Sequence, residues 1–220
     1  MKALTKTILV ATLLAASTAA QAEWSANIGY ASEYHFRGIL QKNSSASAGL
    51  DYESGGFFVG TWAADVGDGL EVDGYFGYGT SLGDVDVSIG YTGYFYTGDF
   101  DETYQEINLG AAYGIVSLDV AFGEWDSPPS DAVCTDAIPP VCSPSKSDYF
   151  YYELTVAGES GLYATLGGFS QDFEGEYLQL GYDTTIADID FGIALIHAND
   201  DLIGESEESL VFTIGKSFDL

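Results

Sequence analysis

The chain has 220 residues, of which 34 are acidic and only six are basic, so its formal net charge is −28. Such acidity argues against nucleic acid and anionic lipid headgroups as electrostatic partners, because both need a basic patch, and it favours cations. With 16 Tyr, 13 Phe and 27 Gly, the composition is typical of a strand-rich protein with little helix.

Residues 1–22 have the pattern of a secretory signal peptide. A basic start (Lys2, Lys6) precedes an apolar run over residues 8–16, and a small-x-small site ends at Ala22. The run is too short to cross a bilayer as a helix, and an uncleaved membrane anchor is the alternative. Cleavage would leave one domain, residues 23–220, with 220 − 22 = 198 residues. Its net charge would be −30, because two lysines and no acids are lost.

Alternation of apolar and polar residues predicts twelve β-strands after the signal peptide. The third of them is apolar on both faces, and the last runs to the end of the chain. In chain order the alternating segments cover residues 24–37, 45–54, 57–66, 70–78, 84–95, 106–113, 116–122, 149–156, 162–166, 178–183, 188–195 and 210–220.

The connections alternate between short and long. The short ones are ESGG, SLGD, YGIV, GESG and TTIAD, and the long ones are GILQKNS, DVGDG, YTGDFDET, Asp126 to Ser147, SQDFEGE and HANDDLIGESEE. Tight turns at one end and long loops at the other are typical of an outer-membrane barrel. A soluble β-sandwich or lipocalin-like barrel is the alternative, but it needs no even strand count. The sequence therefore predicts an all-β fold, a transmembrane up-and-down antiparallel β-barrel of about 12 strands.

In such a barrel the apolar faces meet lipid and the polar faces line the lumen. Tyr34 and Phe36 are then expected in the outer aromatic girdle, whereas Arg37 is a rare cation that lumenal carboxylates can bind. Aromatic residues that parity also places inside, and that would narrow the lumen, are Tyr75, Tyr94, Tyr149, Tyr151, Tyr163 and Phe57. The predicted pore-lining residues are Glu33, His35, Arg37, Asp51, Glu71, Asp73, Asp86, Glu106, Asp119, Glu153, Asp183 and Asp190.

The N-terminal strands resemble a known family. NIGYASEYHFRGILQ, followed by AGLDYESGGFFVGTWAADV, is similar to the N-terminal signature of the TorF family of porins, small proteobacterial outer-membrane proteins. The specific part is the S-x-Y-x-F-R-G-x-x-Q core at residues 32–41. About forty residues match closely, and the resemblance implies a barrel that passes small solutes, with no catalytic residues to carry over. The chain departs from the family at its end, where Asp219 and Leu220 follow Phe218.

Cys134 and Cys142 are the only cysteines, and an exported chain meets an oxidising periplasm. The sequence predicts a disulfide between them, which would close a small ring in one surface loop and contribute ~2.5 kcal/mol in the loop-entropy model. A zinc site is the alternative, but it wants four ligands, and no histidine or further cysteine lies nearby in the sequence.

No catalytic, metal or cofactor site is predicted. His35 and His197 are the only histidines, and neither falls into a Ser/His/acid pattern. His35 fits an ion-pair cluster with Glu33 and Arg37, whereas parity places His197 on the lipid side. Of the acidic loops DFDET and NDDLIGESEE, the second lacks the spacing of a calcium hand, because Leu210 stands where the closing glutamate should be. Weak divalent binding at the lipopolysaccharide surface and a solvated charge run both remain open for them.

The sequence predicts a porin-like diffusion channel that prefers cations, in the outer membrane of a Gram-negative bacterium. The alternative is a non-conducting structural or interaction barrel that acts through its acidic loops, and an outer-membrane hydrolase ranks third. Expected partners are outer-membrane lipids, lipopolysaccharide, small solutes or cations, and the barrel-assembly machinery through the C-terminal strand.

Overall fold

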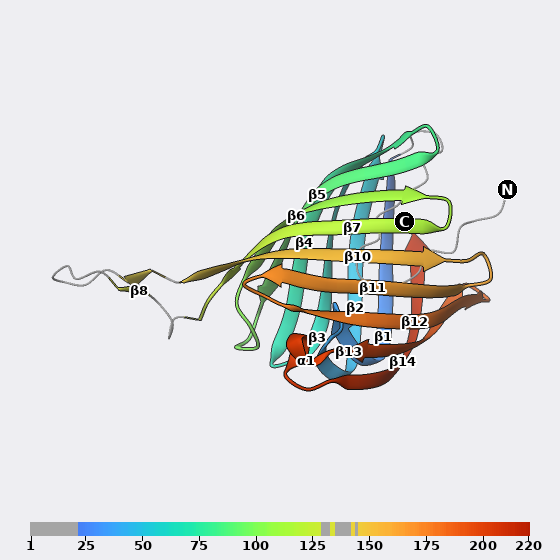
Figure 1. The fold of residues 1–220 in the computed structure, drawn as a ribbon. Coiled ribbons are helices and arrows are strands. Elements are labelled where there is room, and N and C mark those ends of the chain that lie inside the picture. The colour runs from blue at the N-terminus through green and yellow to red at the C-terminus, as the bar shows by residue number, and fades with distance from the viewer. Residues whose placement is uncertain (1–21, 129–132, 135–141, 144) are drawn as a thin grey trace.

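The structure is a computed structural model that describes residues 22–128, 133–134, 142–143 and 145–220. Apart from Ala22, the proposed signal peptide lies outside the described residues. Twelve strands form a closed antiparallel barrel in chain order, sealed by pairing of the first strand with the last (Figure 1). The predicted fold class is therefore confirmed.

The barrel strands are β1 (Glu23–Phe36), β2 (Ile39–Ser54), β3 (Phe57–Gly67), β4 (Gly69–Leu82), β5 (Val85–Tyr96), β6 (Tyr104–Tyr113), β7 (Val116–Asp126), β10 (Lys146–Ala157), β11 (Leu162–Gln171), β12 (Gly175–Ile186), β13 (Ile189–Ala198) and β14 (Glu207–Asp219). A two-stranded sheet, β8 (Val133–Cys134) with β9 (Cys142–Ser143), projects from the connection between β7 and β10 (Figure 1). A short helix, α1 (Asp200–Ile203), lies between β13 and β14. Among the described helices, none is long and apolar enough to cross a membrane.

The alternation seen in the sequence sets which side chains face outward. Exposed aliphatic or aromatic side chains occur on every one of the twelve barrel strands. Leu118 and Leu154, which pair in register on β7 and β10, are typical of them. A soluble protein rarely exposes so much contiguous apolar surface, so the soluble sandwich and the lipocalin-like barrel are poor descriptions of this chain.

The face assignment of Phe57 is wrong. Phe57 is 67% exposed and packs on the outward Tyr78 with ring centroids 4.9 Å apart, whereas Phe58 lies on the lumenal side against Gly77. Because this segment is apolar on both faces, it carries no polar stripe from which parity could be read.

The barrel has two unlike ends. The short-turn end holds the connections Gly55–Gly56, Gly83–Asp84, Gly114–Ile115, 158–161 and Ala187–Asp188, together with the end of β14. The long-loop end holds residues 97–103, 127–128, 145, 172–174 and 199–206. Most of the predicted alternation of connections is thus confirmed.

Two connections at the long-loop end are much shorter than predicted. Most of GILQKNS belongs to β2, and only Arg37 and Gly38 connect it to β1, while Asp68 alone separates β3 from β4. Arg37 and Gly38 have φ angles of 52° and 83°, as the two central residues of the tightest hairpins require. Gly38 and Asn43 suggested a loop in the sequence, but Gly38 lies in the tight turn and Asn43 lies within β2.

The long-loop end of the lumen is filled with side chains. One buried cluster contains Tyr149, Tyr151, Tyr177 and Ile196, against which Phe173 and the α1 residues Leu202 and Ile203 pack from the loops. A second cluster contains Tyr34, Ala64 and Val66, with Phe100 of the β5–β6 loop packed on it. The core of this barrel therefore sits inside the lumen near the long-loop end.

Candidate functional site in the barrel lumen

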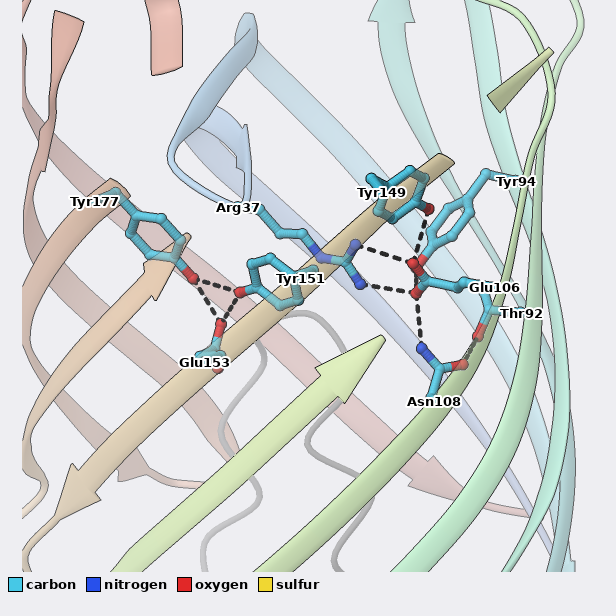
Figure 2. Close-up of polar contacts among 9 residues, drawn as sticks. All are labelled: Arg37, Thr92, Tyr94, Glu106, Asn108, Tyr149, Tyr151, Glu153 and Tyr177. Carbon is cyan, nitrogen blue, oxygen red and sulfur yellow. Dashed lines mark hydrogen bonds and ion pairs between the residues drawn. The ribbon is translucent and has the colours of Figure 1, made fainter. Parts of the chain in front are cut away.

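The end of the β1–β2 hairpin folds into the barrel rather than standing above it. The β1–β2 ladder is irregular on both sides of Tyr34. Before it, Ser44, which lies on β2 between the partners of Ala31 and Glu33, has a φ of 66°, and after it the register shifts between Tyr34 and His35. A slip of one residue moves the following side chains to the other face of a strand. The hairpin end consequently points toward the opposite wall (Figure 2).

This irregularity corrects the prediction that Tyr34 and Phe36 belong to an outer girdle. Tyr34 is only 7% exposed and donates a hydrogen bond to Glu71 inside the lumen. Phe36 packs edge-on against the buried Tyr94, with ring centroids 5.3 Å apart. Both residues are therefore lumenal, because strict parity does not survive the bulge.

Arg37, the only arginine of the chain, forms a buried bidentate ion pair with Glu106 on β6. Its Nη1 donates to Oε2 at 2.9 Å and its Nη2 to Oε1 at 2.7 Å (Figure 2). The side chain of Arg37 is 7% exposed and that of Glu106 is 0% exposed. The predicted pairing of Arg37 with lumenal carboxylates is thus present, and its partner lies 69 residues away in sequence.

Three further donors complete the surroundings of Glu106. Tyr94 and Asn108 donate to Oε1, each at 2.7 Å, and Tyr149 donates to Oε2 at 2.9 Å. Asn108 is itself held by the hydroxyl of Thr92 at 2.9 Å. We call Glu106 with Tyr94, Asn108 and Tyr149 the Glu106 cage. Five donors on one carboxylate, counting the two from Arg37, explain how a charge is tolerated without water.

Aromatic rings cover the faces of the guanidinium. Its carbon lies 3.9 Å from the ring centroid of Tyr151, 4.8 Å from that of Phe36 and 5.8 Å from that of Phe169. Stacking on a ring is a preferred contact of the planar guanidinium, and such cation–π contacts are worth about 0.5–2 kcal/mol. The cage therefore binds the edge of the guanidinium while the aromatic rings bind its faces.

Two more carboxylates lie among tyrosines. Glu71 accepts from Tyr34 at 2.6 Å and from Tyr96 at 3.2 Å. Glu153 accepts from Tyr151 at 2.5 Å and from Tyr177 at 2.6 Å (Figure 2). Tyr34 belongs to the hairpin and Tyr151 covers the guanidinium of Arg37, so these two groups and the Glu106 cage form a polar network of three separate groups around the hairpin end.

Asp73 stands apart from this network. It is 8% exposed, and its Oδ1 has no hydrogen-bond partner among the described residues. It neighbours Tyr94 in the β4–β5 register. The interior near the long-loop end thus holds at least three carboxylates, Glu71, Asp73 and Glu106, around the single guanidinium.

The remaining predicted lining residues lie nearer the short-turn end or at the hairpin. Asp51 accepts from Tyr75 at 2.5 Å, Asp86 from Ser81 at 2.5 Å and Asp190 from Thr185 at 2.5 Å. Asp119 stands opposite Glu153 in the register, and the Oδ1 of Asp183 lies beside Gly192. His35 contacts Glu33 at 3.1 Å, and this pair does not include Arg37.

Reasoning from sequence missed several members of the site. Asn108 shares the predicted polar face of Glu106 but is not among the predicted lining residues, and Tyr177 precedes the outward Leu178, so parity could have found both. Gly38 could not be found, because its role depends on insertion of the hairpin: a Cβ there would lie 2.6 Å from Tyr177. Gly123 is similar, since Tyr149 lies flat on it and a Cβ would come within 2.1 Å of the ring.

Other candidate sites gain little from the structure. His197 is half-exposed on the outer face, as parity predicted, and lies 3.3 Å from Glu208. Within the described ranges, no group of three or more His, Cys, Asp or Glu could hold a metal ion. Backbone pairing places Cys134 opposite Cys142, and the bond between them stays a prediction.

A family model described as a bacterial protein of unknown function, Gcw_chp, matches residues 15–209. The chain belongs to this family. A search of curated proteins finds no match.

Solved structures share the barrel fold. One from a study of the in-meso crystallization of membrane proteins is 12% identical, with a TM-score of 0.58 over 90% of this chain and 84% of that chain. A NanC porin is 14% identical, with a TM-score of 0.49 over 90% and 100% of the two chains. OprD of Pseudomonas aeruginosa is 12% identical, with a TM-score of 0.42 over 90% and 67%. At 12% identity the first of these structures shows a shared fold alone, and the two TM-scores below 0.5 carry no argument.

Proposed function

We propose that this Gcw_chp protein is a porin-like channel of a Gram-negative outer membrane that passes small solutes and prefers cations. The observation that carries the proposal is the pairing of an apolar outer surface on all twelve strands with a lumen lined by carboxylates. The likeness of residues 32–41 to the TorF porins agrees with it. Export through the signal peptide, lipid and lipopolysaccharide contacts, and insertion by the barrel-assembly machinery belong to the same proposal.

The preference for cations follows from the charge inside the barrel. Asp51, Asp86, Asp119, Asp183 and Asp190 lie on lumenal positions toward the short-turn end, and the one lumenal arginine is already paired with Glu106. Walls of low dielectric concentrate such a field and raise the local concentration of cations. The short-turn end of the lumen is therefore an acidic vestibule, defined by these five residues.

The packed long-loop end favours a second candidate, a non-conducting barrel. Glu106 has no exposed side-chain surface, and Tyr149 and Tyr151 are almost fully buried beside it. On this proposal the packing closes the lumen, and a channel must displace the hairpin end to conduct. A barrel that never does so would act through its acidic loops instead.

Planar-bilayer recording of the refolded protein separates the two candidates. A channel should give unitary currents whose reversal potential in a KCl gradient indicates preference for K⁺. Asp86→Asn with Asp119→Asn should reduce that preference, whereas Glu208→Gln on the outer face should leave it unchanged. Anion preference would refute the selectivity, and silence of every variant would favour the non-conducting barrel.

A further inference from the structure

The Glu106 cage has the chemistry of a guanidinium-binding site. A carboxylate that presents both oxygens to the two Nη atoms matches the planar fork of a guanidinium, and an ammonium group offers no such fork. The ring of Tyr151 at 3.9 Å adds a contact that only the flat face of a planar cation can use fully. Size, shape and charge of the site therefore select for one class of cation.

The cation in this site belongs to a hairpin tip rather than to the barrel wall. Arg37 and Gly38 form the tip of a two-residue hairpin, beyond the point where the β1–β2 register shifts. No strand pairing anchors the tip to the walls that it touches, because β1 pairs with β14 only up to Ala31. A movement of the tip out of the lumen would bend the hairpin at that irregularity and would break no pairing of β1 with β14.

Departure of the tip would leave buried carboxylates in the lumen without a cation to balance their charge. Glu106 would keep its donors from Tyr94, Tyr149 and Asn108 but lose its only counter-ion. Glu71 and Asp73 lie in the same part of the lumen, and Asp73 Oδ1 already has no partner among the described residues. A buried carboxylate without a cation is costly, so the vacated cage should bind a solute of the kind that it has lost.

We infer that the Glu106 cage is a binding site for guanidinium-type planar cations in the lumen, and that Arg37 fills it as a tethered ligand that keeps the channel closed. The inference rests on the proposed channel function and deepens it, because it names the class of solute that the lumen recognises. Release of the hairpin tip opens the lumen and exposes the site in one movement.

The test uses the refolded full-length chain in planar bilayers. Arg37→Ala empties the cage and should raise the time-averaged current about tenfold, the change that corresponds to 1.4 kcal/mol of lost closure. Millimolar guanidinium chloride should then restore the low current in Arg37→Ala. Equal concentrations of sodium chloride or tetramethylammonium chloride should not, because neither cation can donate hydrogen bonds to Glu106.

Two further variants control for charge and folding. Lys42→Ala removes a cation from the same hairpin outside the cage, where it pairs with Asp65, and should leave the current unchanged. Arg37→Ala with Glu106→Gln removes both buried charges, so it should fold even if Arg37→Ala alone does not. The double variant should conduct like an open channel and should be insensitive to guanidinium.

The outcomes separate this inference from the channel function itself. If the wild type conducts and both Arg37→Ala and the double variant carry the same current as the wild type, Arg37 does not keep the channel closed, and that part of the inference alone is refuted. Equal action of guanidinium on both variants would refute the site. If neither the wild type nor any variant conducts, the proposed channel function is refuted. The unfolding temperature then tests whether the Glu106 cage binds guanidinium. Guanidinium should then raise the unfolding temperature of Arg37→Ala and not that of the double variant, and no difference would refute the site.

Discussion

At the scale of single residues, the buried pair of Arg37 and Glu106 is the most consequential contact. Taking two charges out of water costs several kcal/mol for each ion, and only good geometry and additional hydrogen bonds offset it. Here the pair is bidentate and the carboxylate receives three more donors. Removal of one partner should therefore lower the free energy of unfolding strongly, whereas replacement of both partners by apolar residues should lower it little.

A double-mutant cycle tests this. Glu106→Leu leaves Arg37 buried without a partner and should reduce the free energy of unfolding by about 3–5 kcal/mol. Arg37→Met with Glu106→Leu removes both charges and should cost much less. Urea unfolding followed by heat-modifiable gel mobility measures both, and additive losses would show that the two residues do not interact.

Gly38 makes a second prediction at this scale. Gly38→Ala adds a Cβ that would lie 2.6 Å from Tyr177, at a φ of 83°, so overpacking of ~1–3 kcal/mol adds to the backbone strain. Gly55→Ala is the matched control, because Gly55 also has a positive φ, 60°, and nothing lies within 4 Å of the added atom. The same urea assay should show a larger loss for Gly38→Ala, and equal losses would contradict the inserted hairpin.

From the sequence, an ion pair of Arg37 could be predicted, but its partner Glu106 could not. A lone arginine in an acidic lumen must find a carboxylate, so an ion pair of Arg37 was foreseeable. Its partner was not, because all the lumenal carboxylates were equivalent candidates and the choice depends on how far the hairpin bends inward. That bend arises from a bulge beside Tyr34, which period-two alternation cannot register.

At the scale of elements, alternation predicts the outer face well wherever one face is polar. The β7–β10 pair follows it throughout, with Leu118 opposite Leu154 outside and Asp119 opposite Glu153 inside. β3 departs from it because both of its faces are apolar, so Phe57 and Phe58 exchange places relative to the prediction. The predicted number of barrel strands is correct despite this error, because turn residues still mark where each strand begins and ends.

The faces of β7 can be tested directly. Leu118→Arg and Leu154→Arg place a cation on the outer surface, where a membrane midplane costs ~2–4 kcal/mol, and should block assembly. Asp119→Arg places the same cation in the lumen beside Glu153 and should be tolerated. Heat-modifiable mobility reports folding, and equal tolerance of all three would rule out the proposed lipid-facing register.

The β8–β9 hairpin gives a prediction about the cysteines. If Cys134 and Cys142 are bonded, reduction should leave barrel stability nearly unchanged, because the small ring they close lies outside the barrel sheet. The loop should become more sensitive to proteases. Thiol labelling of denatured, unreduced protein tests the bond itself, and two reactive thiols in exported protein would refute it.

At the scale of the whole molecule, charge and packing divide the lumen into a packed half at the long-loop end and the acidic vestibule at the short-turn end. The field of the vestibule is screened over about 8 Å at physiological salt and about 3 Å at 1 M. Selectivity for K⁺ should therefore weaken when the KCl concentrations on both sides of the bilayer are raised, from 0.1 M to 1 M, at a fixed ratio between the two sides. Reversal potentials corrected for activity measure it, and a preference independent of salt would point to a narrow filter instead.

The inserted hairpin also has a mechanical consequence. In the closed ring of strands, β1 and β6 are separated by five steps one way and seven the other, so Arg37 and Glu106 join nearly opposite walls. Their ion pair acts as a cross-brace within the packed long-loop end of the barrel. A braced ring resists ovalisation under the lateral pressure of a bilayer, and its cross-section is set from within. Cutting the brace would soften the shape of the cylinder even where every strand-to-strand hydrogen bond remained intact.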